Sequence, residues 1–144
     1  MSSKREIDDR FNKFGRVSFT AITKVNDFVD HLEAGKITGT RCKDCGLYFF
    51  PPRADCHQCL TSNMEWFEVS GNGTLVTFSR LQYAPAGFEE DVPYYIAVVD
   101  FGDYKVFGRI SKDVAENEIC VGMAMKAAVD KLPNDRLSYV FQKA

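Results

Sequence analysis

Four cysteines in a C-x2-C-x10-C-x2-C pattern place the strongest constraint on what this chain folds into. They are Cys42, Cys45, Cys56 and Cys59. Two close thiol pairs separated by a short loop can converge as four tetrahedral ligands of one metal ion. Gly46 directly follows the first pair and gives the backbone the positive φ that a tight turn there needs. The spacing therefore predicts a four-cysteine zinc ribbon.

The pattern also indicates what the metal does. A closed set of four thiolates leaves no coordination position open for a substrate, so we expect one structural ion per chain. Zinc (Zn²⁺) is the ion that we predict, while iron in a rubredoxin-like site uses the same ligands and stays open. His57 lies between the second pair of cysteines, and we expect it to be solvated because four thiols already complete the site.

The N-terminal residues and the overall charge indicate the surroundings of the chain. Two disulfides would require an oxidising compartment, but the start, MSSKREIDDRFNKFG, has no apolar run typical of a signal peptide. We therefore expect a cytoplasmic protein with reduced thiols. No apolar run approaches the roughly 20 residues of a membrane span. A formal net charge of −2 argues against a general nucleic-acid binder, so we expect neither a membrane nor a nucleic acid as partner.

Residues 1–35 are predicted to form a helical arm. Ile7, Phe11 and Phe14 share one face of a first, short helix that ends at Gly15. This helix is terminal and charged, so docking on a partner subunit and packing on its own chain both remain open. A second helix has an apolar stripe, could be capped by Thr23 or Asn26, and ends at Gly35. Its stripe consists of Val25, Phe28, Val29 and Leu32.

From residue 64 onward, the apolar residues alternate with polar ones, and turn signals recur at regular spacing. The expected strands are Met64–Ser70, Thr74–Gln82, Tyr94–Phe101, Tyr104–Ile110, Met123–Lys131 and Leu137–Gln142. Five or six short antiparallel strands fit a small closed barrel, for which the OB-fold is the nearest match. Residues 113–118 fit one helical turn. The prediction is a mainly β protein with an N-terminal helical arm (1–35), a zinc ribbon (36–63) and an OB-fold-like barrel (64–144).

Two long runs of this sequence resemble a known family. GKITGTRCKDCGLYFFPPRADCHQC, followed by EWFEVSGNGTLVTFS, is similar to the acyl-CoA-associated family that joins a rubredoxin-like zinc ribbon to a C-terminal OB-fold. The later segments PYYIAVVDF, VFGRI and ICVGMAMKAAV also resemble strands of that barrel. One departure lies after the second cysteine pair, where Leu60-Thr61-Ser62 stands in place of the glycine that is common in the family.

The resemblance implies an accessory role. Members of this family resemble subunits that accompany thiolases, hydroxymethylglutaryl-CoA synthases or acyl-CoA hydratases, with the partner supplying the catalytic residues. The sequence agrees, because it offers no nucleophile beside a general base. We therefore expect no catalytic residue and no activity of the chain alone. We expect instead a hetero-oligomer with a thiolase-like subunit, with acyl-CoA at or near the interface.

Six residues are candidates for contact with CoA or with the partner. CoA phosphates are bound by Arg and Lys, and the predicted ribbon carries Lys36, Arg41, Lys43 and Arg53. The loop at residues 83–93 is long and presents Tyr83 and Phe88, which could reach a partner's active site. A solvated ribbon surface and a mobile loop are the alternatives, and both remain open.

The remaining chemistry-bearing residues receive structural interpretations. Trp66 and Phe67 are expected in the core between ribbon and barrel, His31 on the surface, and Cys120 in the core as a small apolar residue. Two other functions stay open. Zinc ribbons and OB-folds also serve as nucleic-acid-binding modules, and a four-thiolate iron site would suit electron transfer.

Overall fold

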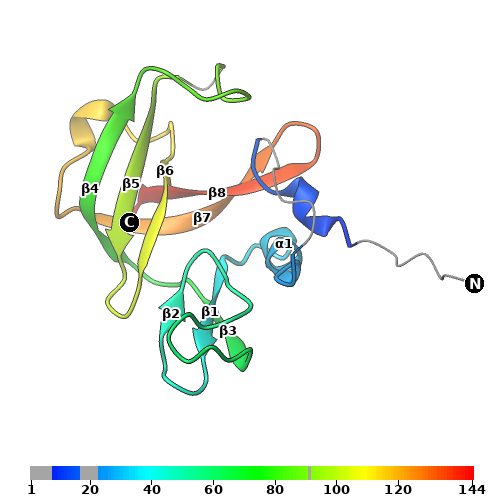
Figure 1. The fold of residues 1–144 in the computed structure, drawn as a ribbon. Helices are drawn as coiled ribbons and strands as arrows, with labels where there is room; N and C mark the ends of the chain where they lie inside the picture. Colours follow the sequence, from blue (N-terminus) through cyan, green and yellow to red (C-terminus); the bar gives the residue numbers. More distant parts are fainter. Residues whose placement is uncertain (1–7, 17–22, 91) are drawn as a thin grey trace, which may run out of the picture.

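Two β-sheets dominate the fold, which a computed structural model describes for residues 8–16, 23–90 and 92–144 (Figure 1). Three strands form a small sheet in the order β2-β1-β3, and five close into a barrel in the order β4-β5-β6-β8-β7. The strands are β1 (Thr38–Cys42), β2 (Tyr48–Phe49), β3 (Met64–Glu68), β4 (Gly73–Leu81), β5 (Tyr94–Asp100), β6 (Lys105–Ile110), β7 (Ala124–Leu132) and β8 (Arg136–Lys143). The expected mainly β architecture is confirmed.

The three-stranded sheet contains one strand that we expected in the barrel. Met64–Glu68 pairs along its whole length with β1, so this part of the prediction was wrong. Gly39 in β1 makes the pairing close, because a Cβ there would lie 2.4 Å from the Phe49 carbonyl oxygen and 2.6 Å from the Phe67 ring. Alternation of apolar and polar residues is the same in both sheets, so it cannot assign a strand to one of them.

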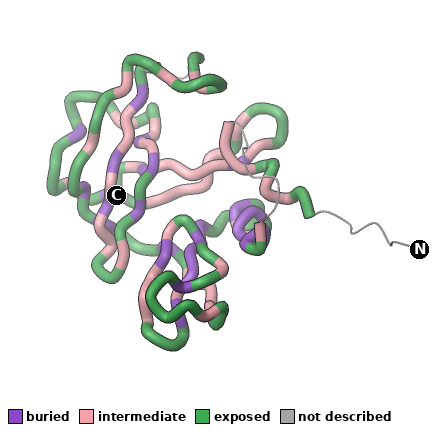
Figure 2. Tube along the Cα trace, in the orientation of Figure 1, coloured by how far each residue is buried: buried purple, intermediate pink, exposed green. Residues whose placement is uncertain are grey.

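The barrel closes around a small apolar core. Its strands pair antiparallel except β6 and β8, which run parallel and pair at only two positions, Arg109 with Val140 and Ile110 with Phe141. Figure 2 shows the buried positions along these strands in purple. The fully buried side chains that fill the barrel are Leu75, Val99, Val106, Met125 and Phe141. Five strands in this order confirm the OB-fold expectation.

The segment before β7 corrects one prediction about a cysteine. The expected helical turn is present as a short 3-10 helix, η2 (Glu116–Glu118). Cys120 is exposed, so placing it in the core was wrong. The chain reverses at Gly122, whose φ is +93° and whose N–H donates to the Leu75 carbonyl, and this turn leaves Cys120 outside while Ile119 and Met125 are buried.

One α-helix, α1 (Asp27–Glu33), packs between the ribbon and the barrel. Phe28, Val29 and Leu32 are buried, as the apolar stripe predicts. Asn26 occupies the N-cap position, but its side-chain amide donates to the Thr23 carbonyl at 2.7 Å and does not cap the helix. Gly35 follows the helix with a φ of +83°. None of the described helices is long and apolar enough to cross a membrane.

The described part of the arm, residues 8–16, packs on its own chain. It forms a four-residue 3-10 turn, η1 (Arg10–Lys13), in place of the expected first helix. The rings of Phe11 and Phe14 lie 6.0 Å and 5.3 Å from the ring of Phe28. Phe14 also pairs with Leu137 of β8. Of the two alternatives, docking on a partner and packing on its own chain, the second therefore holds for these residues. Ile7 lies outside the described part.

Candidate metal centre

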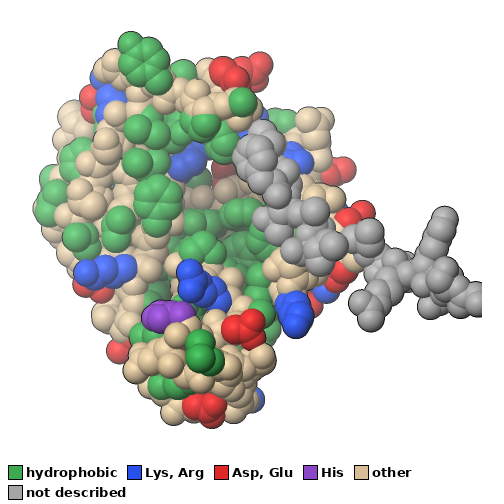
Figure 3. All heavy atoms as spheres, in the orientation of Figure 1, with side chains coloured by type: hydrophobic (Ala, Val, Ile, Leu, Met, Phe, Trp, Pro, Cys, Tyr) green, Lys and Arg blue, Asp and Glu red, His purple; other side chains and the backbone are tan. Residues whose placement is uncertain are grey.

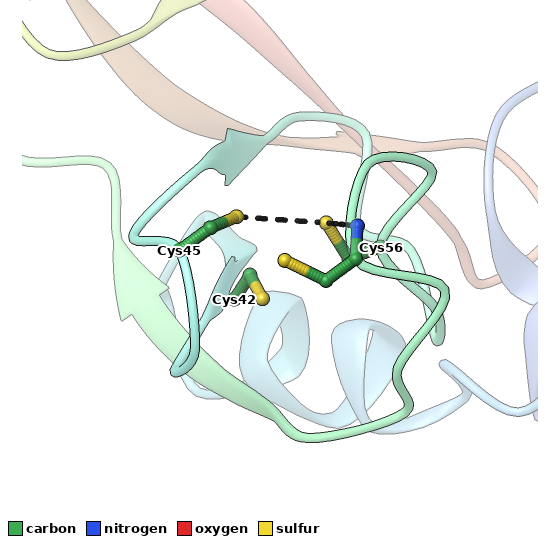
Figure 4. Close-up of side chains that lie close together, drawn as sticks. Cys42, Cys45 and Cys56 are labelled. Carbon is green, nitrogen blue, oxygen red and sulfur yellow. Dashed lines mark hydrogen bonds between the residues drawn. The ribbon is translucent and has the colours of Figure 1, made fainter.

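Four thiols from two loops converge at one end of the three-stranded sheet. Cys42 ends β1, Cys45 lies in the turn to β2, and Cys56 and Cys59 come from the loop between β2 and β3. The four sulfur atoms all lie within 4.8 Å of one another. Figure 4 shows the sulfurs pointing toward a common centre.

The spacing of the sulfurs fits a tetrahedral ion. With metal–sulfur bonds of about 2.3 Å, as for zinc, neighbouring sulfurs of a tetrahedron lie about 3.8 Å apart. The Sγ atoms of Cys45 and Cys56 are 3.7 Å apart. Cys42 and Cys56 are buried while Cys45 and Cys59 are exposed, so the centre lies at the surface of the ribbon. The donor set is one that holds a structural metal without an open position.

Each cysteine pair lies on its own turn, and the two turns have the same hydrogen-bond pattern. In the first, the N–H of Gly46 donates to the Cys42 carbonyl at 2.9 Å, and in the second, the N–H of Leu60 donates to the Cys56 carbonyl at 2.9 Å. Each turn ends in the left-handed region, with φ of +77° at Gly46 and +56° at Leu60. The missing second glycine therefore does not change the turn, because Leu60 itself adopts the conformation.

The thiols influence one another strongly. The backbone N–H of Cys59 donates to the Cys56 sulfur at 3.4 Å, and hydrogen bonds of this kind lower the pKa of Cys56 to about 7. The neighbouring Cys45 thiol and burial raise the pKa of Cys59 to about 12. Four thiolates this close repel one another unless a cation compensates their negative charge. In a metal centre, the bound ion provides this compensation.

The two histidines have different surroundings. His57 is exposed and its ring meets the Phe49 ring edge-on at 5.4 Å, so the prediction of a solvated side chain is confirmed. His31 is half-buried, and its Nδ1 lies 2.8 Å from the Thr38 hydroxyl while its ring meets Trp66 at 4.9 Å. His31 was expected on the surface, and the structure instead places it half-buried between α1 and the three-stranded sheet.

Aromatic rings join the ribbon to the barrel. Tyr104, in the turn between β5 and β6, lies 4.7 Å from Phe67 and 5.5 Å from Tyr48. Phe67 therefore lies between the two sheets, as expected. Trp66 points to the other side of β3 and packs against α1 through His31. These contacts fix the position of the metal-binding turns relative to the barrel.

A hollow of about 300 Å³ opens beside this junction, and we call it the seam hollow. It combines basic side chains with aromatic ones from both sheets. Its lining residues are Tyr48, Phe49, Phe50, Pro51, Arg53, His57, Tyr104 and Lys105. Sequence reasoning found Arg53 but missed Lys105. No local sequence pattern could have identified Lys105, because it lines the hollow only as a result of the packing of the β5–β6 turn against the ribbon.

The other predicted contact residues lie elsewhere. Arg41 donates to Glu65 at 2.8 Å and lies over the Tyr48 ring, so its guanidinium is already engaged. Lys36 and Lys43 are exposed and do not line the seam hollow. In the loop after β4, Tyr83 is 89% exposed, whereas Phe88 is half-buried with its ring 6.4 Å from that of Tyr94.

This fold and this thiol cluster define a class of protein, a rubredoxin-like ribbon followed by an OB-fold. Family models bear this out: "ChsH2, rubredoxin-like zinc ribbon domain" matches residues 29–65, and "ChsH2, C-terminal OB-fold domain" matches residues 66–130. The chain belongs to the DUF35 family. It is 32% identical over 101 residues to a "DUF35 domain-containing scaffold protein" of Methanocaldococcus jannaschii, covering 69% of this chain and 71% of that protein. A protein of the same name from Pyrococcus furiosus is 32% identical over 100 residues, covering 69% and 73%.

Solved structures share the fold. The chain superposes on a chain of the "Ltp2-ChsH2(DUF35) aldolase" with a TM-score of 0.70 and 19% identity, covering 86% of this chain and 98% of that one. A DUF35-family protein of unknown function from Sulfolobus solfataricus matches with a TM-score of 0.53 and 20% identity, covering 92% and 90%. At such low identity, the similarity concerns the fold.

Proposed function

We propose that this chain is a non-catalytic accessory subunit that binds zinc through its four clustered cysteines and acts as a scaffold for a thiolase-class enzyme acting on acyl-CoA. The observation that carries the proposal is the nature of the thiol cluster. It is a closed set of four ligands, which supports structure rather than reaction. In the described part of the chain, His57 lies against Phe49, and His31 against Thr38 and Trp66, so neither is placed as a base beside a nucleophile.

The relatives support the same role. Two archaeal relatives carry the name of scaffold proteins, and the aldolase structure pairs a DUF35 chain with Ltp2. A scaffold that accompanies a catalytic partner needs a rigid body and a stable docking surface. A metal-held ribbon joined to a closed barrel through packed aromatic rings provides both.

The seam hollow supports a contact with CoA. Arg53, His57 and Lys105 border it and are suited to phosphates, while Tyr48 and Tyr104 offer rings for a stacked base. We propose that the anionic head of CoA lies here when the partner is bound. The roles predicted for Lys36, Arg41 and Lys43 stay predictions of partner contact.

The experiment that tests the scaffold role is capture of the tagged full-length chain from its native cytosol, with mass spectrometry and metal analysis of the same sample. We expect a stoichiometric thiolase-like partner, one zinc per chain and no activity of the chain alone. Capture of nucleic acid, or of no protein, would contradict the proposal. Iron in place of zinc would favour electron transfer.

A further inference from the structure

A second cavity, on the outside of the barrel, differs in chemistry from the seam hollow. It has a volume of about 410 Å³ and lies between β4–β6, the loop after β4, the end of β7, the first half of β8 and the arm. We call it the barrel pocket. Its size falls within the range of about 300–1,000 Å³ typical of small-molecule sites. Its position, on the outer strand face between two loops, is where OB-folds generally bind ligands.

The floor of the barrel pocket is apolar because of the pleat of two strands. Ala97 and Val106 point into the core, so their neighbours Ile96 and Phe107 point outward into the pocket. The side chain of Phe107 is 55% exposed. Leu81 at the end of β4 extends the same surface.

The walls of the barrel pocket are mainly apolar, but they include two arginines, Arg16 and Arg109. Gly108 has no side chain, so the ring of Tyr139 lies over it, where a Cβ would be only 2.7 Å from the ring. The Tyr139 hydroxyl donates to the Phe107 carbonyl at 2.5 Å, and burial raises its pKa, so it stays neutral. The Arg109 guanidinium lies 4.5 Å over the Tyr94 ring, and Arg109 takes part in a further interaction within the protein. The rest of the lining is uncharged, so an apolar group is the occupant that most of this surface suits.

The barrel pocket and the seam hollow are neighbours. Phe50 lines the seam hollow, Tyr139 lines the barrel pocket, and their rings meet edge-on at 5.3 Å. Figure 3 shows hydrophobic side chains lining the hollowed face between barrel and ribbon, with basic side chains and a histidine at its edge. One pair of rings thus separates a cationic site from an apolar site. An acyl-CoA has the same order of parts, with an anionic head at one end and an acyl group at the other.

We propose that the barrel pocket binds the acyl group of a thioester substrate. The identity of the apolar group rests on the proposed function, whereas the existence of an apolar ligand site rests on the pocket alone. Held here, the acyl group would be presented by the accessory subunit, and the shape of the pocket would select among acyl chains.

The test uses the zinc-loaded full-length chain and thioesters of N-acetylcysteamine, which keep the acyl group and the end of the CoA arm but carry no phosphate. Acetyl, butyryl, hexanoyl and octanoyl forms are titrated while amide signals are followed by NMR. We expect affinity to rise up to about fourfold for each added methylene, because burying one methylene is worth about 0.8 kcal/mol. The shifted signals should include those of Ile96, Phe107 and Tyr139.

A matched pair of variants on one strand locates the site. Leu81→Glu places a charge in the wall of the pocket and should abolish binding of the octanoyl thioester. Val76→Glu makes the same change at an exposed position of β4 outside the pocket and should bind as the unchanged chain does. If Leu81→Glu fails to fold, Phe107→Ala removes an exposed ring from the floor and should weaken binding at least threefold.

Some outcomes would overturn the inference. These are no binding of the octanoyl thioester, an affinity that does not depend on chain length, or unchanged binding by Leu81→Glu. The result is independent of partner capture. A chain that binds the thioester series but captures no thiolase-like protein would keep the pocket and overturn the scaffold role, and the reverse result would do the opposite.

Discussion

Leu60 adopts a backbone conformation in its cysteine-bearing turn that is unfavourable for a residue other than glycine. Its φ of +56° lies in the left-handed region, which costs a residue with a β-carbon about 1–2 kcal/mol. The side chain is 86% exposed, so no packing within the chain offsets that cost. The Leu60 N–H donates to the Cys56 carbonyl, and this hydrogen bond closes the turn that carries both thiols of the pair.

Replacing Leu60 by glycine should therefore stabilise the ribbon. We expect Leu60→Gly to raise the free energy of unfolding by about 1 kcal/mol, because glycine adopts positive φ without steric cost. Leu60→Ala is the matched control, since it removes the same exposed atoms but keeps the β-carbon. Thermal denaturation of both zinc-loaded variants measures the difference. Equal stability of the two would show that the turn is not strained.

Replacing one cysteine ligand should unfold the ribbon while the barrel stays folded. We expect Cys42→Ser to lose bound zinc and partner capture, because a module this small depends on its metal, while the barrel stays folded. Cys120→Ser is the control, because Cys120 is exposed and outside the cluster. Metal analysis and circular dichroism measure the outcome. Full zinc content in Cys42→Ser would contradict the four-thiol site.

Zinc affinity should rise with pH. In the metal-free chain, the Cys45 thiol and burial hold the pKa of Cys59 at about 12, so this group is protonated throughout the neutral range. Zinc binds the thiolate and must expel that proton, so affinity should increase at least tenfold per pH unit between pH 6 and 8. Competition with a chelator at several pH values measures this slope. A flat profile would mean that Cys59 is not a ligand.

At the scale of helices and strands, the periodicity of apolar residues predicts some elements correctly and fails for others. The stripe of α1 and the alternation of β4 to β8 could be predicted from sequence, because each buries one regular face. Assigning β3 to a sheet could not, because Gly39 selects its partner through a contact between segments far apart in the sequence. Cys120 was misplaced for a related reason, since its apolar neighbourhood hides a turn at Gly122.

The arm is the element whose role depends most on what it contacts. Its rings pack on Phe28, and its Arg10 donates to Asp27 at 2.9 Å and also to Asp30 of α1. Arg136 of β8 in turn donates to the carbonyls of Phe14 and Gly15.

Deleting the arm should therefore destabilise the isolated chain. We expect removal of residues 1–16 to lower the free energy of unfolding by about 2–4 kcal/mol, because two aromatic side chains leave the core surface. Removal of residues 1–7 alone keeps Phe11 and Phe14 and serves as the control. Thermal denaturation of the zinc-loaded chains measures both. An unchanged melting temperature for the longer deletion would show that the arm serves only a partner.

At the scale of the whole molecule, the thiol cluster was predictable and the sites beside it were not. The cysteines are near one another in sequence, so their spacing alone brings them together. The seam hollow joins Arg53 of the ribbon to Lys105 of the barrel, and the barrel pocket draws on four separate segments. Such sites depend on how the sheets are placed, which alternation and turn signals do not contain.

Charge reversal at the seam hollow should weaken CoA binding by the complex. We expect Arg53→Glu combined with Lys105→Glu to raise the Kd for CoA at least tenfold, because each charged hydrogen bond to phosphate contributes about 1.5–3 kcal/mol. Lys126→Glu, at an exposed position of β7 outside the hollow, is the control. Calorimetric titration of the captured complex measures the effect. An equal loss in the control would point to net charge rather than to this site.

The docking of the arm on β8 has a consequence for how the protein is made. Gly15 and Arg136, which hold the arm to β8, are 121 positions apart in the chain. At a synthesis rate of about 5–20 residues per second, roughly 6–24 s pass between the production of one and of the other. Throughout that time Phe14 lacks the strand with which it pairs. A nascent chain interrupted before β8 therefore leaves Phe14 without its partners Leu137 and Tyr139.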